Sequence, residues 1–243
     1  MKIIADTHVH TIASEHAMST VMENIQEAKR KGLRFLAITD HTGRMIGAPS
    51  EGYFICLKSS LPEEYDGIQL IRGCEVNILD TEGTLDLSES NLKRMEWVIA
   101  SVHSLLCAPM TVEESTTLWL NVAKNPLVDV IGHCGDKNFR FNYERVVPEF
   151  AKYGKIVEIN ASSYRTRPTS RSNCVEIARL CAKYGVPIVL SSDAHFAGNV
   201  GNVEEAIRIV TEANIPEELI LNTNYSRFAA KLTEITGRTF PIQ

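Results

Sequence analysis

The chain has 243 residues and a formal net charge of −5, and 44% of its residues are hydrophobic and 23% charged, which is ordinary for a globular domain with one full core. It has no basic block of the kind that binds nucleic acid and no apolar run near the roughly 18 residues of a membrane helix. Asp6 and His8 interrupt the apolar segment that a signal peptide needs, so we expect one cytoplasmic domain over residues 1–243.

The first predicted strand, residues 2–5, leads into two histidines one residue apart, His8 and His10. Residues i and i+2 of an extended chain point to the same side, so both imidazoles can reach one ion. A helix is predicted over residues 20–31, where a Thr-x-x-Glu capping box opens it. Residues 34–38 form the next predicted strand, which ends close to His41.

The remaining predicted strands also lead to polar residues. They cover residues 68–71, 97–101, 128–131, 156–159 and 188–190, with helices over 53–59, 112–124, 143–153, 172–184, 203–213 and 226–236. The first of these strands runs into Glu75, and the next two end at His103 and His133. The last strand is followed by Asp193 and His195.

The six cysteines, at 56, 74, 107, 134, 174 and 181, show no Cys-x-x-Cys spacing. Cys174 and Cys181 lie seven residues apart on one predicted helix, which is a packing position. A chain of this size does not need disulfides for stability. We therefore expect free thiols.

The alternation of strands and helices indicates an α/β fold with a parallel sheet. The strands are short and rich in Ile and Val, as is typical of strands covered on both faces. Seven such units favour a closed barrel, in which all strand carboxyl ends meet at one mouth. The polar residues that follow the strands should therefore converge there.

Nine side chains are candidate metal ligands at this mouth: His8, His10, His16, His41, Glu75, His103, His133, Asp193 and His195. Nine imidazole and carboxylate groups are more than one tetrahedral ion can use. They suit two or three ions of zinc, manganese or iron type. Such clusters lower the pKa of bound water and clamp the atoms of an in-line displacement.

These motifs, in this order, resemble the polymerase and histidinol phosphatase (PHP) superfamily over nearly the entire chain. His16 and the final Asp193-Ala-His195 make the chain most similar to the branch of trinuclear-zinc phosphatases. The resemblance implies a distorted seven-stranded (β/α)7 barrel with its metal site at the C-terminal mouth of the strands. It also implies three divalent ions, with zinc preferred and manganese or iron as alternatives.

The resemblance further implies how the ligands divide among the ions. The first ion would be held by His8, His10, Glu75 and Asp193. Glu75 would bridge to a second ion, which His103 and His133 would also hold. The third ion would be held by His16, His41 and His195. We expect Glu75, Asp193 and His195 to be catalytic residues.

Only two of the proposed ligands are carboxylates, so a three-metal centre would stay strongly cationic and suit a phosphate dianion. We therefore expect hydrolysis of small phosphate monoesters by a metal-bound hydroxide. An amidohydrolase, a nuclease acting on nucleic-acid ends and a non-catalytic metal-binding domain are the alternatives. His16, His41 and His103 disfavour the first of these, and the intact ligand set disfavours the last. Homo-oligomerisation is left open.

Several other polar residues lie in the predicted mouth loops. Arg165 and Arg167 are candidates for binding substrate phosphate bidentately. For Arg44, Asp136, Lys137 and Arg140 a solvated position is the preferred interpretation, and Cys134 is interpreted as a core residue. Asp6 and Asp40 each lie next to a ligand, where they either orient an imidazole or are simply polar residues near a strand end.

Overall fold

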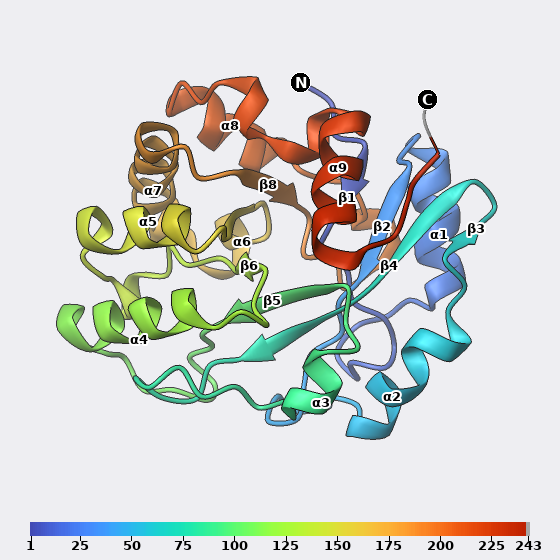
Figure 1. Cartoon of the computed structure of the whole chain (residues 1–243), viewed down its shortest axis with the longest axis horizontal. Coiled ribbons are helices and arrows are strands. Elements are labelled where there is room, and N and C mark those ends of the chain that lie inside the picture. The colour runs from blue at the N-terminus through green and yellow to red at the C-terminus, as the bar shows by residue number, and fades with distance from the viewer. Residues whose placement is uncertain (242–243) are drawn as a thin grey trace.

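Parallel strands follow one another around a barrel in the computed structural model, which describes residues 1–241 (Figure 1). The strand order is β1 (Ala5–Asp6), β2 (Phe35–Ile38), β4 (Ile68–Asn77), β5 (Trp97–Ser101), β6 (Val130–Ile131), β7 (Ile156–Asn160) and β8 (Ile188–Ser191). A short strand, β3 (Glu64–Tyr65), pairs antiparallel with β4 at its start. The seven parallel strands confirm the predicted distorted barrel.

The barrel is closed between β8 and β1 without a regular ladder. On the mouth side, Val9 and Ala194 form an isolated parallel bridge. Deeper in, the side-chain amide of Asn222 donates to the carbonyls of Ala5 (2.8 Å) and Leu190 (2.7 Å). One side chain therefore replaces the hydrogen bonds that direct pairing of the two strands would provide, which explains the distortion.

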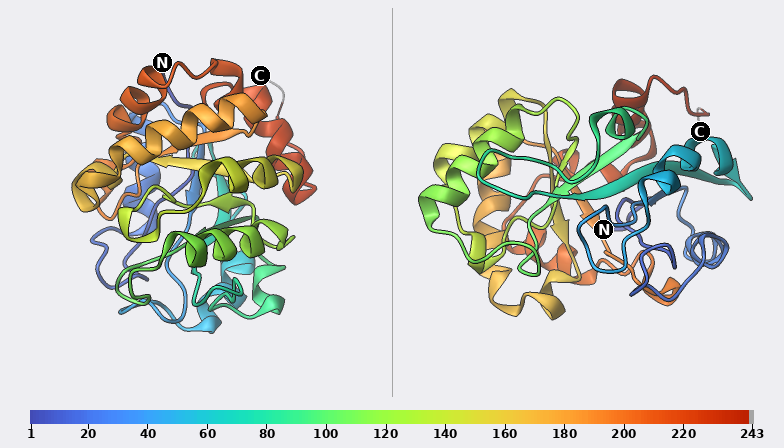
Figure 2. Two further views of the ribbon diagram at one scale, coloured as in Figure 1. Left: turned by 90° about the vertical axis from the view of Figure 1, so that its left-hand side faces the viewer. Right: turned by 90° about the horizontal axis from the view of Figure 1, so that it is seen from below.

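Helices surround the barrel. They are α1 (Val21–Arg30), α2 (Glu51–Ser60), α3 (Glu89–Leu92), α4 (Val112–Lys124), α5 (Tyr143–Lys152), α6 (Ser163–Thr166), α7 (Arg171–Tyr184), α8 (Glu204–Glu212) and α9 (Tyr225–Thr236). Short 3₁₀ turns cover Lys137–Phe139, Pro168–Ser170, Ala197–Asn199, Glu217–Leu219 and Leu221–Thr223. Helices α4, α5, α7 and α8 lie side by side (Figure 2). Among the described residues, every helix is too short or too polar to span a bilayer.

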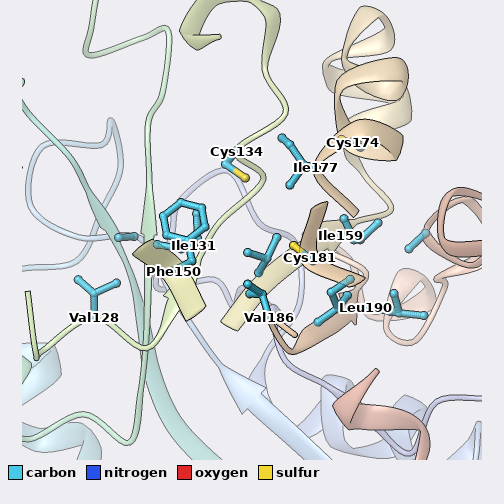
Figure 3. Close-up of a cluster of buried hydrophobic side chains, with 14 of the residues drawn as sticks. Val128, Ile131, Cys134, Phe150, Ile159, Cys174, Ile177, Cys181, Val186 and Leu190 are labelled. Atoms are coloured by element: carbon cyan, nitrogen blue, oxygen red, sulfur yellow. The ribbon is translucent and has the colours of Figure 1, made fainter. Parts of the chain in front are cut away.

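A buried apolar layer separates these helices from the strands. Ile131, Ile159 and Leu190 come from β6, β7 and β8 and share one cluster with Phe150 of α5 and Ile177 of α7 (Figure 3). The same close-up shows Cys134, Cys174 and Cys181 in this layer (Figure 3). All six cysteines are free and only Cys56 is exposed, which confirms the predicted thiols and the packing role of Cys134.

A second apolar cluster fills the amino-terminal half of the barrel. Phe35, Trp97 and Phe228 are its largest members, and the ring of Phe228 meets that of Phe35 edge-on with 5.1 Å between centroids. Phe228 and Leu232 belong to α9, which closes this end of the barrel. The barrel is therefore packed at one end and can present polar groups only at the other.

The two largest differences from the predicted strand boundaries lie in β4 and β1. Strand β4 continues to Asn77 where an end near residue 71 was expected, because Gly73 lets it run against β5: a Cβ at Gly73 would lie 2.5 Å from the carbonyl oxygen of Trp97. Strand β1 is shorter than the predicted 2–5, since the amide of Ile4 is bonded to the carbonyl of Asn222.

Candidate metal centre

Eight of the nine candidate ligands lie in the loops after the strands, and Glu75 lies within β4. Most of these side chains are buried, whereas His16 is exposed and His195 is partly exposed. Two ligands have positive backbone φ angles, 24° at His133 and 53° at Asp193. Such angles are uncommon outside glycine and persist where the surroundings hold the residue in place.

The carboxylate of Glu75 lies between two groups of imidazoles. Its Oε1 is 2.9 Å from Nε2 of His133 and 3.3 Å from Nε2 of His103. Its Oε2 is 2.8 Å from Nδ1 of His41 and 3.3 Å from Nε2 of His8. The two oxygens thus face different imidazoles.

Asp193 approaches the centre from the opposite strand, β8. Its Oδ1 is 3.3 Å from Nε2 of His10, 3.7 Å from Nε2 of His8 and 3.5 Å from Nδ1 of His195. Its side chain also accepts a hydrogen bond from the amide of Asn160 at 3.1 Å. His8, His10, Glu75 and Asp193 are therefore near neighbours.

The remaining histidines form the outer part of the centre. The ring of His16 lies 5.0 Å from that of His41 and 4.9 Å from that of His195, measured between centroids. His10, His41 and His195 each offer a nitrogen within 4.8 Å of the others. The structure thus brings His16, His41 and His195 close together, and His10 lies against His41 and His195.

Several buried polar atoms of these residues have no hydrogen-bond partner in the protein. They are Nε2 of His8, both ring nitrogens of His10, Nδ1 of His41 and Oε2 of Glu75. Buried polar atoms are almost always paired, so a cluster of unpaired ones at a single place fits a group that the protein itself does not supply. Imidazole and carboxylate donors are those that zinc and similar divalent ions take.

Burial and mutual contact change the proton affinities of this cluster. Burial lowers the pKa of His103 to about 4 despite the nearby carboxylate of Glu75. Burial also lowers the pKa of His10 well below its usual value, together with the neighbouring His41. Although burial alone would raise the pKa of Glu75, the surrounding imidazoles hold it well below the usual range. Neutral His10 and His103 beside a carboxylate are in the protonation state that metal binding needs, whereas, against the effect of burial, the carboxylates of Glu158, Glu75 and Asp193 raise the pKa of His8 well above its usual value.

Two residues that the sequence did not single out orient the ligands. Glu158 of β7 accepts a hydrogen bond from Nδ1 of His8 at 2.6 Å and another from the backbone amide of His133 at 2.7 Å. Nδ1 of His103 is bonded to Oδ1 of Asn77 at 2.7 Å. A carboxylate or an amide oxygen can only accept, so both rings carry their proton on Nδ1 and leave Nε2 as a ligand atom.

Asp6 and Asp40 do not contact an imidazole. Asp40 accepts hydrogen bonds from the amide and hydroxyl of Thr11 and from the hydroxyl of Ser14. Asp6 accepts from the amides of Ser192 and Gly201. Each carboxylate therefore fixes a ligand-bearing loop, and of the two alternatives left open by the sequence, direct orientation of an imidazole is not the one observed.

A cavity of about 710 Å³ opens in front of the centre and is lined in part by Arg165 and Arg167. Arg165 is exposed, and the guanidinium of Arg167 lies 3.3 Å from Nε2 of His133. Nε of Arg167 is also 3.6 Å from a carboxylate oxygen of Asp136. Asp136 is buried, so its predicted solvated position was wrong, whereas Arg44, Lys137 and Arg140 are exposed as predicted.

Comparison with known proteins gives matches to one domain family and to relatives named as phosphatases. The PHP domain model matches residues 6–162, and a model described as PHP-associated matches residues 172–221. A probable phosphatase of Thermoanaerobacter sp. (strain X514) is 44% identical over 236 residues, which cover 96% of each chain. A probable phosphatase of Acetivibrio thermocellus is 43% identical over 94% of each chain.

A solved structure shares the fold. The histidinol phosphate phosphatase of Lactococcus lactis, crystallised with zinc, L-histidinol and phosphate, superposes with a TM-score of 0.66. The alignment covers 89% of the present chain and 95% of that protein, at 19% sequence identity. At this identity the match shows a common architecture.

Proposed function

The chain belongs to the PHP domain family, and from that premise we propose that it hydrolyses small phosphate monoesters with three divalent metal ions at the barrel mouth. Its relatives at 42–44% identity are named as probable phosphatases over nearly their full length. The chain is accordingly a metal-dependent phosphatase. The number of ions and the small substrate are the parts that we propose here.

The ligand geometry supports three ions, with zinc as the preferred metal. Glu75 would bridge two of them, since its two oxygens face His103 and His133 on one side and His8 on the other. Asp193 would complete the first site, and His16, His41 and His195 would hold the third ion. We treat residues 1–243 as one unit, because β7 and β8 pair across the boundary of the two matching family models.

The charge of such a centre favours a phosphate monoester. Three divalent ions would bring more positive charge than Glu75 and Asp193 cancel, so a doubly charged group is attracted more than a neutral amide or a singly charged diester. When bound, the ions would supply a hydroxide nucleophile near neutral pH and neutralise the phosphate oxygens. Arg165 and Arg167 line the cavity in front of the centre and would hold the remaining phosphate oxygens.

The single observation that carries this proposal is the carboxylate of Glu75 between two groups of buried imidazoles, where Nε2 of His8 and Nδ1 of His41 have no hydrogen-bond partner. The test is hydrolysis of an aryl phosphate by protein loaded with zinc or manganese. Activity should disappear with a chelator and return with metal, and inorganic phosphate should inhibit. Hydrolysis of lactones or amides without any phosphate ester would favour an amidohydrolase, and faster cleavage of single-stranded DNA would favour a nuclease.

The arginines allow a separate test of substrate binding. Arg165→Ala and Arg167→Ala should each lower kcat/KM for the aryl phosphate about 10-fold, because each removes a charge-assisted contact to phosphate. Arg140→Ala is the matched control, since Arg140 is exposed and does not line the cavity. Equal effects of all three variants would show that general charge, and not contact with phosphate, is responsible.

A further inference from the structure

The cavity in front of the metal centre has two walls of different chemistry. Met45 and Ile46 from the loop after β2, and Leu105 from the loop after β5, form an apolar wall. The other wall comes from the segments after β7 and β8 and is polar or cationic: Ser162, Arg165, Thr166, Arg167 and Asn199. In the barrel order, β2 and β5 lie apart from β7 and β8, with β6 between β5 and β7.

Two of the three side chains in the apolar wall face solvent, whereas Met45 is buried. Ile46 is 76% exposed and Leu105 is 73% exposed, the two highest values among the large apolar side chains of the described residues. Of the twelve such exposed side chains in residues 1–241, half lie in segments that directly follow barrel strands: Ile12, Met18, Ile46, Leu105, Tyr164 and Phe196. Of these six, Ile46 and Leu105 line the cavity, and exposed apolar surface at a pocket is typical of a ligand-binding site.

The loops that carry Ile46 and Leu105 are fixed by hydrogen bonds. The amides of Leu106 and Cys107 both donate to the carbonyl of His103, at 2.9 and 3.0 Å, and hold the turn that presents Leu105. The carbonyl of Gly47 accepts from the amide of Glu15 at 2.9 Å. Both apolar side chains therefore project from backbone whose position relative to the metal ligands is set.

The cavity is also larger than a phosphate group needs. Its volume is about 710 Å³, whereas a phosphate group fills roughly the space of two or three waters of about 30 Å³ each. With the phosphate held between the metal ligands and the arginines, the alcohol portion of a monoester would occupy the remaining space. That space is bounded by Ile46 and Leu105.

We propose that the preferred substrates are phosphate monoesters whose alcohol portion is a bulky apolar group, and that Ile46 and Leu105 are the specificity-determining residues that contact it. This inference rests on the proposed phosphatase function. Covering these two side chains with an apolar group removes their surface from water, whereas a polyol would leave its hydroxyls facing hydrocarbon.

The test compares n-hexyl phosphate with glycerol 1-phosphate, two primary alkyl esters whose leaving groups are similar. The metal-loaded enzyme should show a kcat/KM at least about 10-fold higher for the hexyl ester. Ile46→Ser and Leu105→Ser should each lower that value about 5-fold and leave the glycerol ester within about twofold. Binding of n-hexylphosphonate, which cannot be hydrolysed, should weaken in the same two variants.

Ile55→Ser is the matched control, because Ile55 is 50% exposed on α2 and does not line the cavity. It should leave both kcat/KM values and phosphonate binding unchanged. Equal or better hydrolysis of glycerol 1-phosphate would overturn this inference and leave the phosphatase function standing. No hydrolysis of either ester would overturn this inference, and no hydrolysis of the aryl phosphate as well would overturn the proposed function itself. A change of oligomeric state in the Ile46 and Leu105 variants, without a change in ester preference, would show that a second copy covers the wall.

Discussion

The two halves of the barrel interior are built from the same strands but differ in what completes them. In the amino-terminal half, Ile71, Trp97 and Ile156 belong to a closed apolar cluster sealed by α9. In the carboxyl-terminal half, the same strands supply Glu75 and Glu158. One half is completed by packing within the chain, whereas the other leaves buried nitrogen and oxygen atoms unpaired.

This difference indicates a division of roles along one barrel. The apolar half gains its free energy from burial of large side chains, which needs no ligand. The mouth half places unpaired imidazoles and carboxylates together, which costs stability unless a cation occupies the space between them. Changes at the mouth should therefore alter metal binding and activity, and changes at the closed end should alter stability alone.

The change expected to have the largest effect is Glu75→Gln at the mouth. An amide has only one acceptor oxygen and presents a donor to the second cation, so the bridge is lost. We expect a fall in kcat/KM of about 10³-fold or more, together with loss of bound metal. Steady-state kinetics and elemental analysis of the same preparation would check this, and full activity with complete metal content would show that Glu75 is not the bridge.

Phe228→Ala makes the opposite test at the closed end. Phe228 is fully buried and packs edge-on against Phe35 and Trp97. Its truncation should lower the free energy of unfolding by about 3–5 kcal/mol, measured by denaturant titration. Metal content and kcat/KM of the folded protein should stay close to those of the unchanged chain. A loss of metal in this variant would mean that the two halves are not independent.

Glu158→Gln examines a residue of the mouth half that orients the candidate ligands. Because Glu158 holds the proton of His8 on Nδ1 and also bonds the amide of His133, we expect metal affinity to fall about 10- to 100-fold. Competition with a chromogenic chelator would measure it. Ser191→Ala, which removes only the hydroxyl that donates to Glu158, is the control and should have a smaller effect.

The smallest predicted effect concerns Asp129, at the start of β6. Burial raises its pKa to about 6, so its folded-state pKa lies above that of the unfolded chain. The stabilising contribution of the protonated form is therefore complete below about pH 4 and is lost as the pH rises through 6. Asp129→Asn should avoid that loss. Between pH 4 and pH 7, its free energy of unfolding should therefore rise by about 1–2 kcal/mol relative to that of the unchanged chain. If urea titrations gave the same difference in free energy of unfolding between the variant and the unchanged chain at every pH in this range, the raised pKa of Asp129 would be contradicted.

The convergence of the candidate ligands could be predicted from the sequence because each histidine, as well as Asp193, follows a strand, and parallel strands of a barrel end at one mouth. Glu158 was missed because it lies within an apolar strand. The alternation of Ile156, Glu158 and Asn160 was the signal that placed it on the inner face. The role of Asn222 could not be predicted, because its contacts with Ala5 and Leu190 join segments far apart in the chain.

The most direct test of the central claim is the metal content of the purified chain. Elemental analysis after gentle purification should give close to three divalent transition metals per chain, because nine candidate ligands converge at the mouth and are more than one or two ions would use. Phe228→Ala should give the same content, and Glu75→Gln a lower one. A content of one metal per chain or less, even after incubation with zinc or manganese, would contradict the trinuclear centre.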